Sequence, residues 1–424
     1  MLDVKFIREN LTAVKTNIHN RKLRADPEKV LQLHEKRSSL VQQLDAQRHE
    51  RNEHAGKMKG SMDNRNELIA HGRALKDSIA AAEKELHTLE AELRTELERI
   101  PNMTHPDAPI GSEEKDNREI SRSGTIRRFP FPPRDHIELG ALLDIIDFEH
   151  AATVSGSKFY YLKNEAVLLE MALIHYAMDI LRAEGFDILI TPDIAREEIV
   201  SNIGFSPRGD ESNVYTIEDT DLCLIGTSEI TLGAYYAGKT IPAEKLPVKL
   251  AGLSHCFRKE AGAAGQFSKG LYRVHQFTKL EMFVYAHPQN SEDILEELQQ
   301  IEQRIFSGLG IPFRLIDTCT GDLGAPAYRK YDLEAWIPGR GDAGGWGEIT
   351  SASNCTDYQA HRLKTFYRDD EKRNYVHMLN GTALAVPRAI ISILENFQEE
   401  DGSVLMPEVL RPWLGFDRIH PPKN

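Results

Sequence analysis

A long stretch without proline restricts the fold of this chain more than any other feature. No proline occurs between Pro27 and Pro101. Two runs of residues within it recur at alternating steps of three and four, the spacing of helices that pack along one apolar seam. The first run contains Val30, Leu33, Arg37, Leu40 and Leu44, and the second contains Leu68, Gly72, Leu75, Ile79, Ala82, Leu86, Leu89 and Leu93. Turn residues at 59–64 separate the runs, so we predict two long helices folded into an antiparallel hairpin.

A proline-rich link follows the second run and predicts a domain boundary. Pro101, Pro106 and Pro109 lie in it together with Asn102 and Gly111, and residues of these types interrupt regular structure. We therefore predict an N-terminal domain over residues 1–105 and a C-terminal domain over residues 106–424.

The C-terminal part has the mixed pattern of an α+β domain. Helix-like stretches at 165–184, 291–309 and 389–397 are interspersed with β-rich stretches at 187–191, 248–253 and 272–284. The two kinds do not alternate regularly, which favours a mainly antiparallel β-sheet flanked by helices over a doubly wound parallel sheet. No G-x-G-x-x-G follows a predicted strand and no GxxxxGK[ST] occurs, so the two commonest nucleotide-binding loops are not predicted.

Charge and cysteine usage narrow the class of protein. The net charge is −13, which argues against binding nucleic acid through bulk positive charge. Residues 1–65 nevertheless carry 14 Lys or Arg against 9 Asp or Glu, so positive charge gathers toward the predicted hairpin. We find no run of 18 apolar residues and expect no membrane span. The four cysteines form no C-x-x-C pair, which makes a zinc site or disulfide framework improbable and a reducing cytoplasm the simplest compartment.

One face of the predicted strand at 271–283 carries charged and aromatic residues. Alternate side chains of a strand point to opposite faces. The opposite face, which begins with Tyr272 and Val274, is mostly apolar. The charged face could arrange the phosphates, base and amine of a ligand in order, although a solvated face with one aromatic residue is the alternative; its members are Arg273, His275, Phe277, Lys279 and Glu281.

Three further segments contain residues suited to phosphate or metal binding. Arg258 and Glu260 precede a Gly- and Ala-rich segment, which we interpret as a mobile loop carrying Lys269 toward a site; a surface hairpin is the alternative. Glu348, Ser351 and Ser353 offer the hard oxygen ligands that Mg²⁺ prefers, or form an ordinary polar strand end.

The third segment predicts the start of a helix. Gly381, Thr382 and Ala383 are expected to form a compact turn, and Pro387 suits the first helical position. Arg388 then falls in the first helical turn, where an anion could bind. A core helix whose arginine pairs with a carboxylate is the alternative.

Taken in order, these motifs resemble those of class II aminoacyl-tRNA synthetases. CFRKE with RVHQFTKLEMF resembles motif 2, LNGTALAVPR resembles motif 3, and EGFDILITPDI resembles motif 1, which builds the dimer interface in this class. More narrowly, the chain is similar to the seryl-tRNA synthetase family from residue 1 to about 413, including MLDVKFIREN, IPNMTHPDAPIG, GTSEITL and EITSASNCTDYQAHR. Each motif alone is weak, but their shared order makes chance improbable.

The resemblance implies roles for individual residues. Arg258, Glu348 and Arg388 are implied as catalytic, with Arg258 on the α-phosphate and Arg388 on the γ-phosphate of ATP. Serine binding is implied for Thr227, Ser228, Glu229, Glu281 and Thr382. ATP binding is implied for Arg258, Lys259, Glu260, Val274, Phe277, Glu348, Ile349, Thr350, Ser351 and Arg388, to which the strand pattern adds Arg273. Mg²⁺ would be held by Glu348 and Ser351.

The resemblance also implies a reaction and partners. Serine and ATP would form seryl-adenylate and pyrophosphate, and the seryl group would pass to the 3′ end of serine tRNA. Selenocysteine tRNA could be a second acceptor. The hairpin would grip the long variable arm of the tRNA across a homodimer. Ser228, Ala383 and Pro387 depart from the residues that the family usually carries there.

Three alternatives stay open at this point. A related enzyme could load a carrier protein instead of tRNA, but such enzymes lack the hairpin. A non-catalytic binding protein would be expected to lose Arg258, Glu281, Glu348 or Arg388, and all four are present. A coiled-coil scaffold would leave the C-terminal part unexplained.

Overall fold

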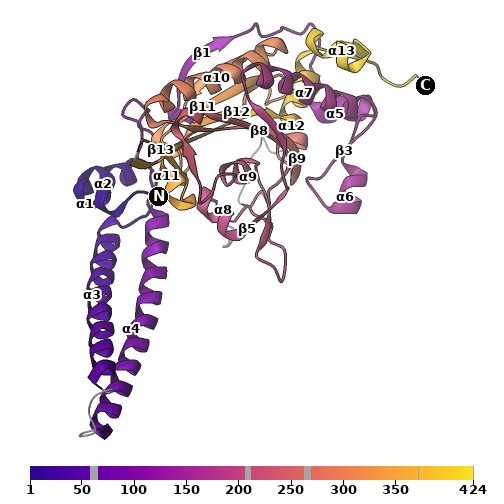
Figure 1. The fold of residues 1–424 in the computed structure, drawn as a ribbon. Helices are drawn as coiled ribbons and strands as arrows, with labels where there is room; N and C mark the ends of the chain where they lie inside the picture. Colours follow the sequence, from indigo (N-terminus) through magenta and orange to yellow (C-terminus); the bar gives the residue numbers. More distant parts are fainter. Residues whose placement is uncertain (58–64, 206–211, 262–268, 371, 424) are drawn as a thin grey trace. The chain divides into compact units, whose positions relative to one another are not determined.

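The N-terminal part forms the predicted helical hairpin. The computed structural model describes residues 1–57, 65–205, 212–261, 269–370 and 372–423, and the chain divides into two compact units, Met1–Met103 and Thr104–Asn424. The first unit consists of α1 (Val4–Glu9), α2 (Leu11–Asn20), α3 (Pro27–Lys57) and α4 (Arg65–Arg99) (Figure 1). The predicted boundary between residues 105 and 106 stays a prediction, and the predicted turn at 59–64 lies outside the described residues.

An apolar seam and cross-helix ion pairs hold the hairpin together. Asp26 accepts a hydrogen bond from the backbone N–H of Lys29 at the start of α3, 2.9 Å away. Arg37, the polar member of the first run, pairs with Glu90 at 2.8 Å, and Arg48 pairs with Glu83 at 2.8 Å. The buried seam residues are Val30, Leu33, Leu40, Leu44, Leu75, Ile79, Leu93 and Leu97.

The second unit is built on an eight-stranded sheet in the order β1-β10-β11-β12-β15-β9-β8-β4. Neighbouring strands are antiparallel except β4 and β8, which are parallel. This confirms the predicted α+β class with a mainly antiparallel sheet. The strands are β1 (Arg118–Ser123), β4 (Asp187–Ile190), β8 (Val248–Phe257), β9 (Gln276–Ala286), β10 (Phe313–Asp317), β11 (Arg329–Ile337), β12 (Gly345–Asn354) and β15 (His377–Ala385).

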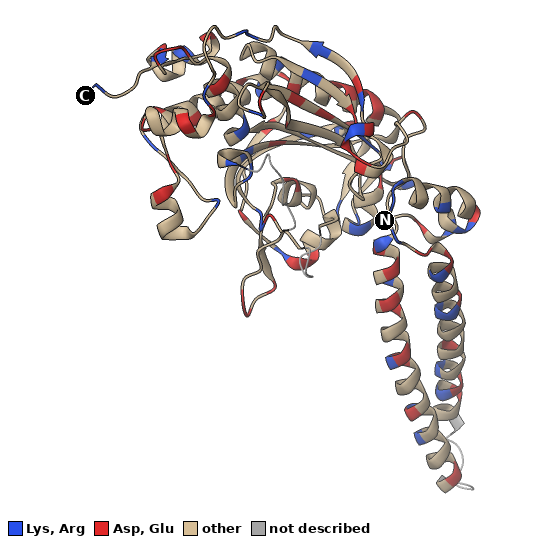
Figure 2. Ribbon diagram, turned by 180° about the vertical axis from the view of Figure 1, so that it is seen from behind, with Lys and Arg blue, Asp and Glu red and all other residues tan. Residues whose placement is uncertain are grey.

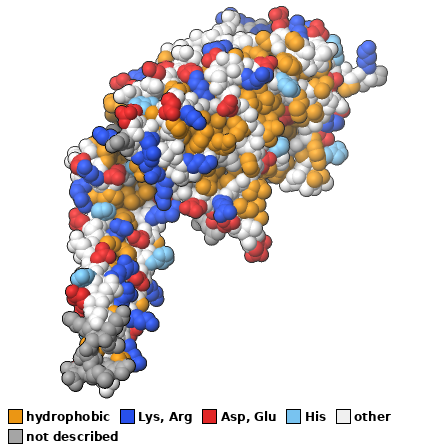
Figure 3. All heavy atoms as spheres, viewed as in Figure 1, with side chains coloured by type: hydrophobic (Ala, Val, Ile, Leu, Met, Phe, Trp, Pro, Cys, Tyr) orange, Lys and Arg blue, Asp and Glu red, His pale blue; other side chains and the backbone are white. Residues whose placement is uncertain are grey.

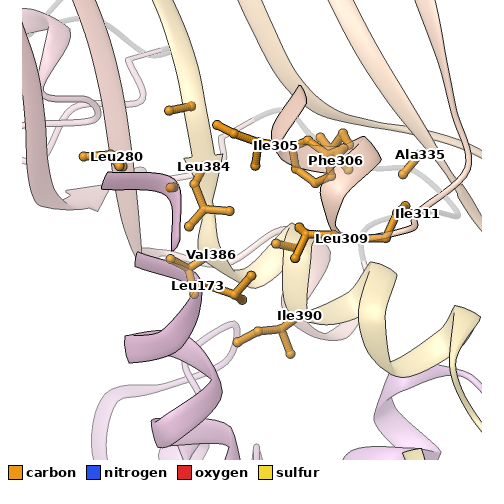
Figure 4. Close-up of a cluster of buried hydrophobic side chains, with 14 of the residues drawn as sticks. Leu173, Leu280, Ile305, Phe306, Leu309, Ile311, Ala335, Leu384, Val386 and Ile390 are labelled. Carbon is orange, nitrogen blue, oxygen red and sulfur yellow. The ribbon is translucent and has the colours of Figure 1, made fainter. Parts of the chain in front are cut away.

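Helices cover both faces of this sheet. One face packs against α7 (Glu165–Ala183), α10 (Ser291–Gly308) and α12 (Val386–Asn396), and Figure 4 shows part of the resulting core. The other face packs against α8 (Glu197–Ile203), α9 (Glu229–Gly233) and α11 (Tyr358–Leu363). Leu280 and Met282 of β9 join the first core, whereas Phe283 and Tyr285 join the second. The alternation predicted for this strand is therefore present from Phe277 onward.

Smaller elements complete the unit. The helices α5 (His136–Leu142), α6 (Glu149–Ser155) and α13 (Arg411–Leu414) lie outside the two layers named above. The remaining strands form small sheets: β2 (Ile146–Asp147), β3 (Tyr161–Leu162), β5 (Ile194–Arg196), β6 (Leu222–Leu224), β7 (Thr240–Pro242), β13 (Phe366–Asp369), β14 (Lys372–Tyr375), β16 (Val404–Leu405) and β17 (Arg418–Ile419). In the described part of the chain, no helix has the length and apolar character needed to cross a membrane.

Two local predictions are wrong. The strand expected from Tyr272 begins at Gln276, because Gly270–Tyr272 forms a 3₁₀ turn whose first residue has φ +56°. Gly381–Ala383 is not a turn but lies inside β15, where the glycine leaves room for neighbouring side chains. The predicted mobile loop falls mostly on residues 262–268, which lie outside the described residues.

Candidate active site

A cavity of about 240 Å³ lies along the face of the sheet that carries α9. Strands β8, β9, β12 and β15 and the start of α12 contribute its walls. Of the residues predicted to form the site, all but Ser228 and Lys259 line this cavity: Thr227, Glu229, Arg258, Glu260, Arg273, Val274, Phe277, Glu281, Glu348, Ile349, Thr350, Ser351, Thr382 and Arg388. Residues that are about 160 positions apart in the sequence therefore meet in one cavity.

One end of the cavity is a buried cluster of complementary polar groups. Glu281 accepts a hydrogen bond from Thr382 Oγ1 at 3.2 Å and forms an ion pair with Lys279. Lys279 Nζ also donates to Thr227 Oγ1 at 2.8 Å. Glu281 and Lys279 are almost fully buried, and a buried ion pair persists only when further hydrogen bonds support it. This end is suited to a small zwitterion that also carries a hydroxyl group.

Glu229 adds a second carboxyl group to the same end. Its Oε1 accepts hydrogen bonds from Gln359 Nε2 at 2.8 Å and from Asn380 Nδ2 at 3.0 Å. Burial, followed by the nearby negative charge of Glu281, raises the pKa of Glu229 to about 7. The carboxyl group therefore changes charge near neutral pH, which is typical of a residue in a functional site.

The middle of the cavity holds an arginine and an aromatic ring. Arg258 Nε donates to the carbonyl of Gly226 at 3.2 Å, and its Cζ lies 5.2 Å from the ring centroid of Phe277. Glu260 has φ +51°, a conformation that costs free energy in a residue other than glycine. Glu260 Oε2 accepts a hydrogen bond from Arg273 Nη1 at 2.8 Å. This arrangement presents a flat ring beside fixed positive charge, as a nucleotide base and its phosphates require.

A β-bulge brings Glu348 and Ser351 to the same face of β12. Their separation of three residues would place them on opposite faces of a regular strand. Thr350 pairs with Leu333 and Glu348 pairs with Glu334, so Ile349 is an extra residue in the ladder. The bulge therefore explains how a sequence spacing that does not fit a strand still yields a shared site.

Glu348 faces Arg388 at the opposite end from Glu281. Arg388 Nη1 donates to Glu348 Oε1 at 3.1 Å and to its carbonyl oxygen at 2.9 Å. Burial opposes the charge of Glu348, but Arg388, Lys330 and Arg258 hold its pKa below the ordinary value. Arg388 lies in the first turn of α12 with Pro387 at its N-terminus, as predicted. An ionised carboxylate is thus available among three cations.

The residues at this end fit a magnesium ion that also binds phosphate. Glu348 is ionised, its side chain is 45% exposed, and Ser351 lies on the same face. No group of three or more His, Cys, Asp or Glu side chains among the described residues could hold a metal by itself. Mg²⁺ usually takes one or two protein oxygens together with substrate phosphates, so Glu348 and Ser351 are a sufficient protein contribution.

Several predicted residues point elsewhere. The Ser228 hydroxyl is fully buried and donates to the Gly252 carbonyl at 2.9 Å. Lys259 is exposed, and its ammonium group lies 5.9 Å from the ring centroid of Tyr215. Ser353 does not line the cavity, and Lys269 lines a separate one. Ala383 and Pro387, which differ from the residues that the family usually carries, do not strain the backbone. Ala383 is a bulge residue of β15 without positive φ, and Pro387 occupies a position at the start of α12 that suits proline.

Three polar residues that line the cavity were not among the predicted site residues, namely Lys279, Asn380 and Tyr272. Lys279 was on the charged face of the predicted strand, two residues before Glu281, and this pairing was a usable signal. Asn380 lies next to the residues mistaken for a turn. Tyr272 was placed on the apolar face, but the 3₁₀ turn directs it to the cavity.

Two models of known protein families match the chain. The model of the class II tRNA synthetase core domain (G, H, P, S and T) matches residues 215–397, and the model of the seryl-tRNA synthetase N-terminal domain matches residues 1–104. The fold and the cavity thus define a class II aminoacyl-tRNA synthetase, a class for which ATP is a substrate.

Full-length relatives narrow the class to one family. The chain is 58% identical to the serine–tRNA ligase of Treponema denticola over 99% of this chain and 100% of that one, and 53% identical to that of Borreliella burgdorferi over the whole of both. Its structure is similar to seryl-tRNA synthetase from Pyrococcus horikoshii complexed with ATP (TM-score 0.89, 40% identity, all of both chains). It is also similar to cytoplasmic serine–tRNA ligase from Naegleria fowleri in complex with AMP (TM-score 0.84, 31% identity, 100% and 99% of the chains). The chain belongs to the seryl-tRNA synthetase family.

Proposed function

We propose that this chain activates L-serine with ATP and transfers the seryl group to tRNA, the reaction of a serine–tRNA ligase. The observation that carries this proposal is the division of one cavity into a buried carboxylate–lysine–threonine end and an arginine-rich end. The first end suits a small hydroxylated amino acid, and the second suits a triphosphate. The relatives from Treponema denticola and Pyrococcus horikoshii, a serine–tRNA ligase and a seryl-tRNA synthetase, support the same reaction for this chain.

Serine would bind at the buried end. Glu281 and Glu229 would attract the ammonium group, and the hydroxyls of Thr227 and Thr382 would bracket the substrate side chain. A site built to hydrogen-bond a substrate hydroxyl rejects an analogue without it, often by about 10⁴-fold or more. Serine would therefore be selected over alanine when it binds at the buried end of the cavity.

ATP would lie between Phe277 and α12. Phe277 would stack on adenine, with Arg258 at the α-phosphate, while Arg388 would neutralise the γ-phosphate. Glu260 and Arg273, which already pair with each other, would frame the base and phosphates. Mg²⁺ held by Glu348 and Ser351 would add charge neutralisation when bound.

The chemistry needs position and charge more than a protein nucleophile. A serine carboxylate oxygen attacks the α-phosphorus, the bond to the bridging oxygen of the β-phosphate breaks, and pyrophosphate leaves. A terminal ribose hydroxyl of tRNA then attacks the carbonyl carbon of seryl-adenylate, and AMP leaves. Arg258 is placed to stabilise the charge on the α-phosphate through both steps.

The hairpin would recognise tRNA by shape rather than by bulk charge. α4 carries eight acidic and six basic residues, so residues 1–103 contain 19 basic and 17 acidic residues in all. Both signs are interspersed along the hairpin in Figures 2 and 3. The basic excess found in residues 1–65 is therefore mostly offset within the hairpin. A long stiff arm with scattered basic groups suits backbone contacts to a folded RNA, with serine tRNA as the partner and selenocysteine tRNA as a second substrate.

A homodimer is supported by exposed apolar residues of the motif 1 segment and of the helix α7 that precedes it. Leu168 and Met171 of α7 are 49% and 53% exposed, and Ile190 of β4 is 83% exposed. Such residues gain free energy when a second copy covers them. None of the four cysteines, all of which are buried, forms a disulfide among the described residues, which agrees with a cytoplasmic enzyme.

Pyrophosphate exchange into ATP, followed by charging of serine tRNA, tests the proposal. We expect exchange with serine and not with alanine, and then transfer to serine tRNA. Exchange without transfer would favour loading of a carrier protein. An intact, folded protein without exchange would overturn the proposal in favour of a binding protein.

A further inference from the structure

A second cavity adjoins the first one at its arginine-rich end. It measures about 270 Å³, and Tyr272 lines both cavities. Arg340, from the loop between β11 and β12, lines only the second cavity, whereas Arg388 lines only the first. The Tyr272 side chain thus forms a partition with one arginine in each cavity.

Both guanidinium groups interact with this ring. Arg388 Cζ lies 4.9 Å and Arg340 Cζ lies 5.3 Å from the ring centroid of Tyr272, within the range of cation–π attraction. Arg340 Nη1 also donates to the Tyr272 hydroxyl at 3.0 Å. The hydroxyl in turn donates to the Glu348 carbonyl at 3.3 Å, and the same carbonyl accepts from Arg388 Nη1 at 2.9 Å. A continuous chain of contacts therefore runs from Arg340 to Arg388.

The backbone of the tyrosine is anchored separately from its ring. The N–H of Leu271 donates to His136 Nε2 at 3.2 Å, and His136 Nδ1 lies 2.8 Å from Glu395 Oε1. These contacts fix the 3₁₀ turn but do not reach the phenol. Arg340 and the Glu348 carbonyl are the hydrogen-bond partners that orient the phenol.

Gly347 keeps open the space that Arg340 occupies. A Cβ atom built at Gly347 would lie 2.5 Å from Arg340 Nη1 and 3.1 Å from the Tyr272 hydroxyl. The first distance is shorter than non-bonded atoms tolerate, so any side chain at position 347 would displace the guanidinium. The loop itself contains GRGDAG, a G-x-G-x-x-G match, but it joins two antiparallel strands and no helix follows, which excludes the dinucleotide-binding role of that motif.

The second cavity is not suited to phosphate. Asp135, Asp342 and Glu395 line it beside Lys269 and Arg340, so acidic groups outnumber basic ones. The Arg340 guanidinium acts instead through the tyrosine that it contacts.

From these contacts we infer that Arg340 is a positioning residue for ATP activation: it fixes the Tyr272 ring against Arg388, in a space that Gly347 leaves free. The inference deepens the proposed function and rests on it, because Arg388 is placed there at the γ-phosphate. An arginine held in advance loses less side-chain entropy when phosphate binds. Loss of Arg340 should therefore weaken ATP binding and leave serine binding unchanged.

Arg340→Ala and Arg340→Lys, assayed beside the unaltered enzyme, test the inference. We expect the KM for ATP in pyrophosphate exchange to rise about tenfold in Arg340→Ala, with the KM for serine within about twofold. Arg340→Lys should recover part of the loss, because an ammonium can contact the ring but lacks the planar fork. The matched control is Arg122→Ala, which removes a guanidinium that lies 5.4 Å from the ring of Trp346 in β12. The KM of this control variant for ATP should not change.

Gly347→Ala tests the same contact with Arg340 still present. It should raise the KM for ATP as Arg340→Ala does, and the double variant should be no worse than Arg340→Ala alone, since both changes break one contact. Circular dichroism and a thermal unfolding curve would verify that each variant is folded. Equal losses for serine and ATP, a wild-type KM for ATP in Arg340→Ala, or additive effects in the double variant would each overturn the inference.

Calorimetric titration with ATP alone separates this inference from the proposed function. If the unaltered enzyme binds ATP but shows no serine-dependent exchange, the proposed function fails, while the ATP affinities of the variants still decide the role of Arg340. A drop in ATP affinity in Arg340→Ala and Gly347→Ala, but not in Arg122→Ala, supports it; equal affinities in all four proteins contradict it.

Discussion

At the residue scale, the site contains carboxyl groups that their surroundings hold in different electrostatic states. Glu348 is held ionised by arginines, Glu281 is paired with Lys279, and Glu229 titrates near neutral pH. Glu302 of α10 is fully buried beneath the sheet, and the neighbouring charges of Glu281, Asp332 and Glu348 add to the effect of burial in raising its pKa. Environment thus assigns different roles to chemically similar side chains.

Glu302 is predicted to be a neutral acid. Its Oε2 accepts from Thr350 Oγ1 at 3.0 Å, and its Oε1 finds no hydrogen-bond partner among the described residues. Burial, followed in part by the charges of Glu281, Asp332 and Glu348, raises its pKa well above the ordinary value. The native state then keeps a proton that the unfolded state releases, so stability falls as pH rises from the ordinary pKa toward the native one.

Glu302→Gln should therefore be at least as stable as the unaltered protein, with an advantage that grows between pH 6 and pH 9. Glu302→Ala should lose about 2–3 kcal/mol at pH 6, because it leaves a cavity and an unpaired Thr350 hydroxyl. This deficit should shrink toward pH 9, because the alanine variant also lacks the titrating group. Urea unfolding at both pH values measures these differences. An advantage of glutamine that stays constant from pH 6 to pH 9 would show that Glu302 is already ionised in the native state.

Glu229 should make serine binding depend on pH. Its pKa of about 7 means that the carboxylate forms as pH rises through neutrality, and only the carboxylate attracts an ammonium group. The KM for serine should fall from pH 5.5 to pH 8 and then level off. Glu229→Gln should raise this KM about 10- to 100-fold, the cost of one charged hydrogen bond, and remove this pH dependence. An unchanged pH profile in that variant would assign the titration to another group.

At the element scale, the sequence predicted structure well where the cause was local. Heptad spacing identified α3 and α4, and the position of Pro387 identified the start of α12, because both patterns depend on neighbours in the sequence. The β9 strand was predicted to start too early, because the 3₁₀ turn at Gly270–Tyr272 is fixed by His136, which is distant in the sequence.

Glycine in β15 misled the prediction for a similar reason. A Cβ atom at Gly381 would lie 3.1 Å from Glu302 Oε1 and 3.2 Å from Met282 Cε, so the glycine is needed for tight packing inside a strand and not for a turn. The bulge at Ile349 was also invisible, since only pairing with β11 defines it. Most residues that line the cavity were predicted from family motifs, whereas Tyr272, which the strand pattern placed on the apolar face, required the tertiary structure.

The start of α12 yields a prediction at this scale. Pro387 precedes Arg388 at the helix N-terminus and restricts the backbone of the unfolded chain. Pro387→Gly should lower the free energy of unfolding by about 1 kcal/mol or more and, by loosening the first turn, raise the KM for ATP several-fold. The KM for serine should stay the same. Denaturant unfolding and pyrophosphate exchange measure the two effects, and a loss of stability with an unchanged KM for ATP would show that the turn is ordered without proline.

At the scale of the whole molecule, the two units separate two tasks. The cavity residues all lie within Thr104–Asn424, and the hairpin lies within Met1–Met103. We therefore expect amino acid activation to need no residue of the hairpin, whereas selection of tRNA is proposed to need its length. Because the first unit has only a small excess of positive charge, the length of the hairpin, rather than its charge, is the property to test for tRNA selection.

Shortening the hairpin tests this division of tasks. Gln47 Nε2 of α3 donates to Ser78 Oγ of α4 at 3.0 Å, so residues 49–77 can be replaced by a short glycine-rich turn that joins facing positions. Serine-dependent pyrophosphate exchange should stay within about twofold of the unaltered enzyme, while kcat/KM for charging of serine tRNA should fall by about 100-fold or more, the loss of roughly 2.7 kcal/mol of binding. A matched variant with Arg48→Ala and Glu83→Ala removes an exposed ion pair between the helices without shortening the arm, and it should charge tRNA within a few-fold of normal. If the shortened enzyme still charges serine tRNA normally, tRNA recognition resides in the catalytic unit and the hairpin serves another purpose.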